Sequence, residues 1–447
     1  MAEQKKQIQT FLLRLAAAAL VILFLYAMRA ARESGRFPGS RGTMAAVALG
    51  GLIILAWAAG DLFQWIGLPR MTGYMMTGLV TGPYMLKLIS LESVHTLKFI
   101  DHVALTLIAL RAGHEVRLSL LRRRLKGILS ISFSLVILSM VAGFLLIFFG
   151  GRYFLPFLRD APGRTVLLVA LLFSVIEMAK SPVTTIAILD ETKAEGPLAE
   201  TTLGVVIVND VILIVLFGLV MALGTRIANP GEVKAGFIKE VLWHLFGSLG
   251  AGALIGWLVS LALKWIQRWL FLLVIGFSLG LTLLCHALHL EILLVCLTAG
   301  FVMENFTRQG GRMLGGIEDV TPLVYLIFFP VASASLDLSV VRTSWVAAAV
   351  ILTARKLIIY SSVRLGSRLA NECEAVRKYG WMGYINQSGV TLVLAILIAE
   401  EFPEFGSHFK AIALAVIVIT DVYAPAMFKY ALYRAGEIPG ERKRSRV

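Results

Sequence analysis

One aspartate interrupts a long apolar run in the middle of the chain. In VVIVNDVILIV at positions 205–215, Asn209 and Asp210 are the only polar side chains. An ionised carboxylate at the centre of a membrane-spanning helix costs about 3 kcal/mol on insertion scales. The cost is tolerable when the carboxylate binds a cation or takes up a proton, and an exchange cycle alternates between these two states.

We therefore expect Asp210 to bind a monovalent cation and a proton in turn. Asn209 supplies an amide oxygen or holds Asp210 in position, without adding a second titrating charge. The alternative is a structural aspartate that hydrogen-bonds to a neighbouring helix.

Two further apolar segments are interrupted by polar residues and a helix breaker. SVIEMAKSPVTT at positions 174–185 contains Pro182, which lacks an N–H and clashes with the preceding turn. YINQSGVT at positions 384–391 has Gly389 at the corresponding place. Matching breakers predict two discontinuous helices that cross near the membrane midplane and turn free carbonyls toward an ion. The alternative is a pair of kinks that only assist packing.

The polar residues at these breaks are the next candidates for the site. Glu177 and Lys180 also have the i,i+3 spacing at which opposite charges pair on one helix. We expect Ser181 and Thr184 to be oxygen ligands of the cation and Glu177 and Lys180 to be supporting charges. At the second break, the candidates are Gln387 and Ser388.

The deepest basic pair lies in TARKLIIY at positions 353–360. One of Arg355 and Lys356 is expected to balance Asp210 or to cap the crossing, the alternative being that they extend toward the polar stretch at Arg364. Asp421 occupies the position in the second half that corresponds to Asp210, and we expect it to be structural.

No cofactor is expected. The cysteines Cys285, Cys296 and Cys373 are scattered without metal-ligand spacing or a disulfide framework. The one predicted metal ligand is therefore Asp210, for a monovalent cation only. No Ser/Lys, Asp/Asp or zinc-ligand constellation and no phosphate-binding loop is found, so the sequence does not predict an enzyme.

Long apolar helices must position these residues. The 447 residues are 58% hydrophobic and only 16% charged, which excludes a soluble globular class. We expect an all-α polytopic membrane protein with 13–14 transmembrane helices. The expected helices cover residues 11–28, 43–63, 70–90, 97–115, 127–150, 165–190, 198–224, 237–264, 269–288, 290–305, 320–338, 343–365, 378–400 and 408–432.

The chain contains an internal repeat. SPVT at 181–184 recurs as SGVT at 388–391, LGVVIVNDV at 203–211 as LAVIVITDV at 414–422, and LSLLR at 118–122 as LSVVR at 338–342. The copies lie an odd number of expected helices apart, so they face opposite ways in the membrane. Inverted-topology repeats are typical of secondary transporters. We place the repeats at about 70–224 and 290–432.

Charge placement predicts the orientation. The net charge of +14 comes from basic residues in short loops and the tail, which indicates a positive-inside bias rather than nucleic-acid binding. Both termini are expected in the cytoplasm and the protein in a bacterial inner membrane. Residues 1–42 form an extra helix or a cleavable signal-like segment, residues 43–432 the membrane domain, and residues 433–447 a basic cytoplasmic tail.

In their order and spacing, these segments resemble the monovalent cation–proton antiporter superfamily, which includes sodium–proton exchangers and bacterial potassium-efflux antiporters. The resemblance covers about residues 45–432. It is carried by GLPRMTGYMMTGLVTGP at 67–83, IALRAGHE at 108–115, VNDV at 208–211, IFFPVASASLDL at 327–338, ARKL at 354–357 and NQSG at 386–389.

The resemblance implies a homodimer in which each subunit has a scaffold domain and a mobile six-helix core. It also implies that Asp210 binds cation and proton alternately, and an Asn-Asp pair favours electroneutral exchange. Three positions depart from the family pattern. Lys180-Ser181 stands where Thr-Asp is usual, Ala332 to Ser335 replace a glycine-containing turn, and Gly204 lies where a glutamate often precedes the Asn-Asp pair.

The sequence therefore predicts exchange of Na⁺, Li⁺ or K⁺ for protons. Two alternatives remain open at this point. One is a sodium-coupled carrier of an organic anion bound by Lys180 and Arg355. The other is an ion sensor that does not transport.

Overall fold

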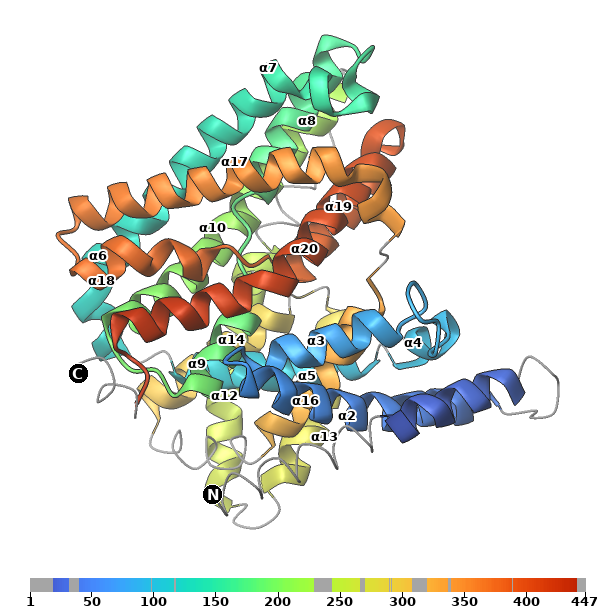
Figure 1. Cartoon of the computed structure of the whole chain (residues 1–447). Coiled ribbons are helices and arrows are strands. Elements are labelled where there is room, and N and C mark those ends of the chain that lie inside the picture. Colours follow the sequence, from blue (N-terminus) through green and yellow to red (C-terminus); the bar gives the residue numbers. More distant parts are fainter. Residues whose placement is uncertain are drawn as a thin grey trace, which may run out of the picture.

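The computed structural model describes residues 19–31, 40–97, 99–115, 118–228, 243–265, 270–288, 290, 292–307, 320–336, 339–387 and 389–439. These residues are almost entirely helical and contain no strand (Figure 1). A helix at Ala19–Ala31 comes first. The predicted leader and the basic tail fall largely on residues 1–18 and 440–447, which lie outside the described residues.

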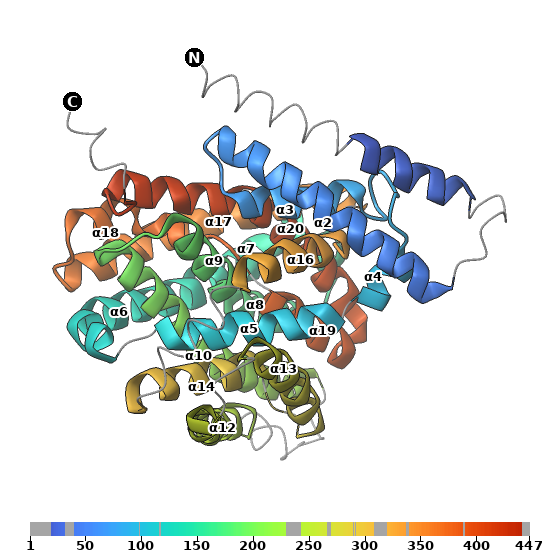
Figure 2. The ribbon, with the colours of Figure 1, turned by 90° about the horizontal axis from the view of Figure 1, so that it is seen from below.

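The helices form two sets. The flanking unit comprises α2 (Arg41–Trp65), α3 (Arg70–Thr81), α4 (Leu91–Leu97), α5 (Phe99–Glu115), α12 (Ser248–Trp265), α13 (Leu270–Ala287), α14 (Ile292–Phe306) and α16 (Thr321–Ala334). The crossing unit comprises α6 (Leu118–Leu138), α7 (Phe144–Phe154), α8 (Gly163–Ile176), α9 (Pro182–Thr192), α10 (Pro197–Ala228), α17 (Ser339–Leu369), α18 (Glu374–Tyr379), α19 (Gly389–Glu401) and α20 (Pro403–Ala435). In Figure 2, α12 and α13 lie at one edge of the molecule and α2 at another.

Both predicted helix breaks are present. The first helix stops at Ile176 and restarts at Pro182, which occupies the first turn of α9, where its missing N–H is not needed. The second break separates α18 and a 3₁₀ turn, Gly380–Tyr384, from α19. In Figure 1 the chain from α18 to α19 lies between α17 and α20. The all-α fold with two discontinuous helices is therefore confirmed.

The two halves of the crossing unit run in opposite directions. The Ser130 hydroxyl in the middle of α6 donates to the Gly366 carbonyl of α17 at 2.8 Å. Closer to the start of α6, Arg124 pairs with Glu372, just past the end of α17, at 3.4 Å. The start of α10 and the end of α20 also meet, because the Glu437 carboxylate accepts the Leu198 N–H at 2.7 Å. Antiparallel pairing of α6 with α17 and of α10 with α20 is what the sequence repeat requires.

Each expected helix overlaps a described helix or two consecutive helices, and positions 11–18 and 237–242 of the expected helices lie outside the described residues. Among the described residues, five unbroken helices are long and apolar enough to cross a membrane, namely Arg41–Trp65, Arg123–Phe154, Pro197–Thr225, Ser344–Leu369 and Pro403–Ala435.

Some predicted boundaries were wrong. The basic stretch expected as a loop at 116–126 is already helical from Leu118, whose N–H donates to Asn305 Oδ1 of α14 at 2.6 Å. This contact gives α6 an N-terminal cap from outside its own segment, which local sequence does not reveal. The helix expected over 70–90 ends at Thr81, before Gly82 and Pro83.

Glycines let the flanking helices pack backbone to backbone. A Cβ at Gly78 of α3 would overlap the Pro330 carbonyl of α16, and a Cβ at Gly113 of α5 would overlap the Leu297 carbonyl of α14. Gly300 of α14 makes the reciprocal contact with Leu110. Such close contacts are the usual means of helix association where lipid removes the hydrophobic driving force. They make the flanking unit a closely packed body.

We predict that Gly78→Ala destabilises the protein. The new methyl group would overlap backbone that has no flexible end to move aside, and overpacking of this kind costs about 1–3 kcal/mol. Gly50→Ala on α2 is the matched control, because no atom lies within 4 Å of a Cβ placed there. Thermal unfolding in detergent measures both variants. An unchanged midpoint for Gly78→Ala would contradict the packing argument.

Candidate functional site

The two helix breaks lie against each other inside the crossing unit. The Gln387 side-chain amide, in the second break, donates to the Ile176 carbonyl at the end of α8, at 3.4 Å. Both breaks leave backbone carbonyls without their helical partners. In a membrane protein these groups must find donors within the protein or in a water-filled cavity.

Arg355 of α17 supplies those donors. Its guanidinium donates to the Glu177 carbonyl, to the Ala179 carbonyl at 2.7 Å, and to the Ile385 carbonyl of the second break at 3.4 Å. It also pairs with the Glu177 carboxylate, at 3.4 Å. Arg355 is 1% exposed, and its planar fork reaches several acceptors at once, which an ammonium does not do. One side chain thus holds the two breaks together.

Lys180 places a second buried cation in the first break. Its side chain is 1% exposed, and its ammonium donates to the Met178 carbonyl at 2.7 Å. The ammonium also interacts electrostatically with Arg355, Glu177 and Asp210. Two cations and two carboxylates therefore occupy this region, and their formal charges sum to zero when all four are ionised.

Ser181 and Thr184 form the start of α9. The Ser181 hydroxyl accepts the Thr184 N–H at 3.2 Å and contacts the Thr184 hydroxyl at 3.0 Å, so it caps the helix. Both side chains are buried. The positive end of the α9 dipole faces the break, and it favours a carboxylate there over a bare cation.

Asn209 and Asp210 lie on α10, beside the two breaks. Asp210 is partly exposed. Neither side-chain atom of Asn209 forms a hydrogen bond among the described residues, and the same holds for both atoms of Asn386 and for Gln387 Oε1. These three side chains are buried. Because buried carboxamides are ordinarily hydrogen-bonded, these oxygens and amides suit water or a cation.

The structure brings most of the predicted residues together, with three changes. Glu177 pairs with Arg355 instead of Lys180, because the chain leaves the helix after Ile176 and the i,i+3 geometry is lost. Lys356 points to α20, with its ammonium 4.6 Å from the centre of the Tyr423 ring, so only Arg355 caps the crossing. Ser388 lies outside the described residues.

Asn386 was missed at the sequence level. It directly precedes Gln387 in the interrupted segment, so its position next to a predicted break was the available signal.

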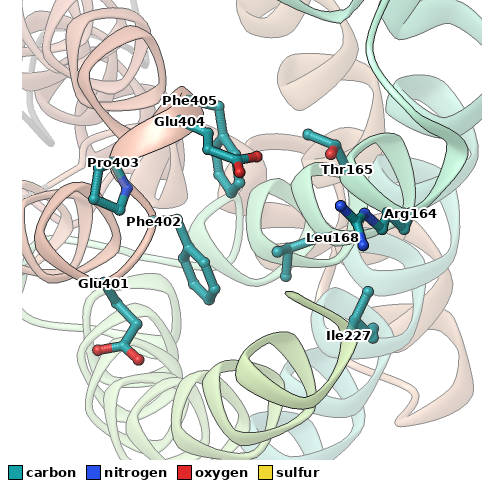
Figure 3. A pocket seen from close by; sticks show the side chains of 9 residues that line it. All are labelled: Arg164, Thr165, Leu168, Ile227, Glu401, Phe402, Pro403, Glu404 and Phe405. Atoms are coloured by element: carbon teal, nitrogen blue, oxygen red, sulfur yellow. The ribbon is translucent and has the colours of Figure 1, made fainter. Parts of the chain in front are cut away.

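A separate cavity of about 160 Å³ lies where α8 begins, α10 ends and α19 joins α20. Arg164 and Glu404 point toward this space, and the Phe402 ring lies within it, while the Glu401 carboxylate is turned away (Figure 3). None of the predicted site residues lines it, so we do not assign the cavity to the site.

Comparison with known proteins agrees with this architecture. The family described as "Sodium/hydrogen exchanger, transmembrane" matches residues 11–432. The Na(+)/H(+)-K(+) antiporter GerN of Bacillus cereus is 25% identical over 394 residues, which cover 83% of this chain and 92% of GerN. The probable Na(+)/H(+) antiporter GerT of the same organism is 24% identical over 304 residues, covering 65% of this chain and 72% of GerT.

A solved structure shares the fold. The sodium proton antiporter MjNhaP1 from Methanocaldococcus jannaschii superposes with a TM-score of 0.62 at 17% identity, covering 89% of this chain and 97% of that chain.

We predict that Arg355→Met strongly destabilises the protein. It would leave Glu177 as an unpaired buried carboxylate and remove donors from the carbonyls of both breaks, and breaking a buried pair costs about 3–5 kcal/mol. The matched control is Lys356→Met, the same loss of charge one residue along the helix. Denaturant unfolding in detergent should separate the two variants, and equal stability would contradict the bridging role of Arg355.

Proposed function

Because this chain belongs to the sodium/hydrogen exchanger family of transmembrane cation/proton antiporters, we propose that Asp210 is its exchange site. In this proposal Na⁺, Li⁺ or K⁺ and protons bind Asp210 alternately, and the site opens to one membrane face at a time. The family consists of transporters and is not a class of enzymes.

The observation that carries the proposal is the set of polar groups around Asp210. The Asp210 carboxylate on α10 lies beside two interrupted helices. Among the described residues, the side-chain amides of Asn209 and Asn386 and the oxygen of the Gln387 amide are buried and form no hydrogen bond. Oxygen ligands of this kind suit alkali cations, which are hard ions. Ser181 and Thr184 add hydroxyl oxygens at the start of α9.

Charge balance supports electroneutral exchange. With Asp210 ionised, the charges of Glu177, Lys180, Asp210 and Arg355 sum to zero. Binding one proton or one monovalent cation at Asp210 adds the same single charge. If the other three residues keep their charges, the proton-bound site and the cation-bound site have the same net charge. One cation then exchanges for one proton without net movement of charge.

Lys180 acts in this proposal as a resident competitor of the transported cation. Its ammonium interacts electrostatically with Asp210, and the adjacent Ser181 stands where the family pattern expects an acidic partner. A cation that binds Asp210 must therefore overcome the field of a nearby fixed positive charge. We expect a weaker apparent cation affinity than an acidic residue at this position would give.

GerN, whose match covers 83% of this chain, is described as an Na(+)/H(+)-K(+) antiporter, so K⁺ belongs among the ions to be tested. The family resemblance also supports a homodimer. The positive charge of the loops supports a bacterial plasma membrane with the C-terminus in the cytoplasm. The organic-anion alternative loses support, because the Arg355 guanidinium is already engaged by Glu177 and three backbone carbonyls.

We predict that Asp210→Asn abolishes cation-driven proton movement in proteoliposomes. The amide cannot exchange a proton for a cation, so adding Na⁺, Li⁺ or K⁺ outside should no longer shift the internal pH. Asp421→Asn, at the repeat-related position, is the matched control and should retain most of the activity. If the Asp210→Asn variant still exchanged cations for protons, Asp210 would be ruled out as the exchange site. A parent protein that moves no protons with any of the cations would favour an ion sensor.

We predict that Lys180→Met lowers the half-saturating cation concentration. Removing the resident charge leaves a net negative site, and a gain of about 1.4 kcal/mol corresponds to roughly tenfold tighter binding. Titration of the initial exchange rate with Na⁺ and K⁺ gives this concentration, and Lys356→Met serves as the control. An unchanged or increased half-saturating concentration would refute competition by Lys180.

A further inference from the structure

The last turn of α9 carries two carboxylates that contact the flanking unit. Asp190 pairs with Arg111 of α5 at 2.5 Å, and it accepts the Tyr325 hydroxyl of α16 at 2.8 Å. Arg111 donates in addition to the Thr321 hydroxyl, at 3.2 Å. The side chain of Arg111 is buried and that of Asp190 is 10% exposed. A charged pair therefore spans the boundary between the crossing and flanking units.

The neighbouring Glu191 makes a second contact across the same boundary. Its carboxylate accepts the Arg70 N–H at 2.8 Å and the Met71 N–H at 3.5 Å, so α9 supplies the N-terminal cap of α3. Lys429 of α20 lies 3.7 Å from the same carboxylate. The end of α9 is thus attached to three flanking helices, α3, α5 and α16.

The two sides of this contact differ in how they are held in the fold. Arg111 lies two residues before Gly113, where α5 packs on the backbone of α14, and the next residue, His114, contacts Glu304 of α14 at 2.9 Å. By contrast, α9 has only the residues Pro182–Thr192, and a non-helical segment joins it to α8. The flanking side is held by backbone packing between helices, whereas α9 is a short helix that the break separates from α8.

The residues of this contact line a cavity beside α9. A cavity of about 330 Å³ is lined by Arg111, Asp190, Glu191 and Tyr325 together with Ala187. On α9, the positions 184, 187 and 191 share one helical face. The cavity therefore lies on the face of α9 that continues to Thr184 at the site, while Ala187 itself is only 1% exposed.

The chemistry of the contact favours reversible closure. An apolar boundary of the same area would be as stable or more stable, because buried ion pairs gain little over well-packed apolar residues. Carboxylate and guanidinium groups, however, recover hydration when the boundary opens to water. Opening an ionic boundary therefore exposes less apolar surface than opening an apolar boundary of the same area would.

We propose that Asp190 and Glu191, bound to Arg111, Tyr325 and the start of α3, form an ionic latch that shuts the site from the membrane face on which α9 ends. The latch must open once in each exchange cycle. The inference rests on the proposed function for the identity of the site that is shut. The contacts of Asp190 and Glu191 that shut it do not depend on that function.

Solvent access to Ala187 tests the latch without transport. The reporter is Ala187→Cys in the full chain, with Cys285, Cys296 and Cys373 replaced by alanine, purified in detergent and labelled with a water-soluble maleimide. Asp190→Asn should raise the labelling rate roughly tenfold, which corresponds to a loss of about 1.4 kcal/mol from the shut state. Arg111→Gln should raise the labelling rate by the same factor. The double variant should label no faster than either single variant, because both substitutions remove the same Arg111–Asp190 interaction.

Two further variants keep the test decisive. Tyr325→Phe removes only a hydroxyl group and should give a smaller increase in the labelling rate. It therefore tests the latch even if the charge variants fold poorly. Lys193→Gln changes a charge that lines the same cavity outside the latch, and it should leave the rate unchanged. The latch is refuted if Asp190→Asn and Tyr325→Phe leave labelling within about twofold of the parent, or if Lys193→Gln raises it equally.

Repeating the labelling in Asp210→Asn separates the two proposals. The latch variants should still accelerate labelling there, whatever Asp210→Asn does to exchange.

Discussion

The fold depends on one requirement, which is that backbone carbonyls released inside a membrane protein must find donors. The two interrupted helices free such groups at Glu177, Ala179 and Ile385, and the Arg355 guanidinium donates to all three. Its pairing with Glu177 offsets part of the cost of burying its charge. The crossing of two broken helices, and thus the polar region beside Asp210, is possible because one rigid, multiply donating side chain is placed where both breaks meet.

This arrangement makes the site polar but balanced in charge. Arg355 and Glu177 pair with each other, so in the proposed exchange Asp210 and Lys180 are the charges that an arriving ion meets. A site with one exchangeable carboxylate and one fixed ammonium differs from a purely acidic site, because its empty ionised state is already neutral. The two carboxylates at the end of α9 connect this region to the glycine-packed flanking unit. In the proposed latch, the site opens when α9 moves away from that unit.

Local patterns predicted the elements well but their long-range partners poorly. Pro182 and Gly389 correctly marked both breaks, since a missing N–H or an absent side chain acts on its own turn. The i,i+3 pairing of Glu177 with Lys180 was wrong, because the break that Pro182 imposes removes the helix that this pairing needs. The choice between Arg355 and Lys356 was open in the sequence, because adjacent residues on a helix point about 100° apart and only packing shows which one faces the breaks.

By itself, the sequence determined an all-helical membrane protein, its two breakers, its inverted repeat and the isolated carboxylate Asp210. These follow from hydrophobic length, backbone chemistry and the cost of burying charge, all of which act within a segment. Only the tertiary structure decided that Arg355 joins the breaks, that Asn386 lies buried beside Gln387, and that Asp190 binds Arg111. Arg355 and Glu177 are 178 positions apart, and Arg111 and Asp190 are 79 apart. Contacts at such separations are set by how helices pack, and no local periodicity encodes that.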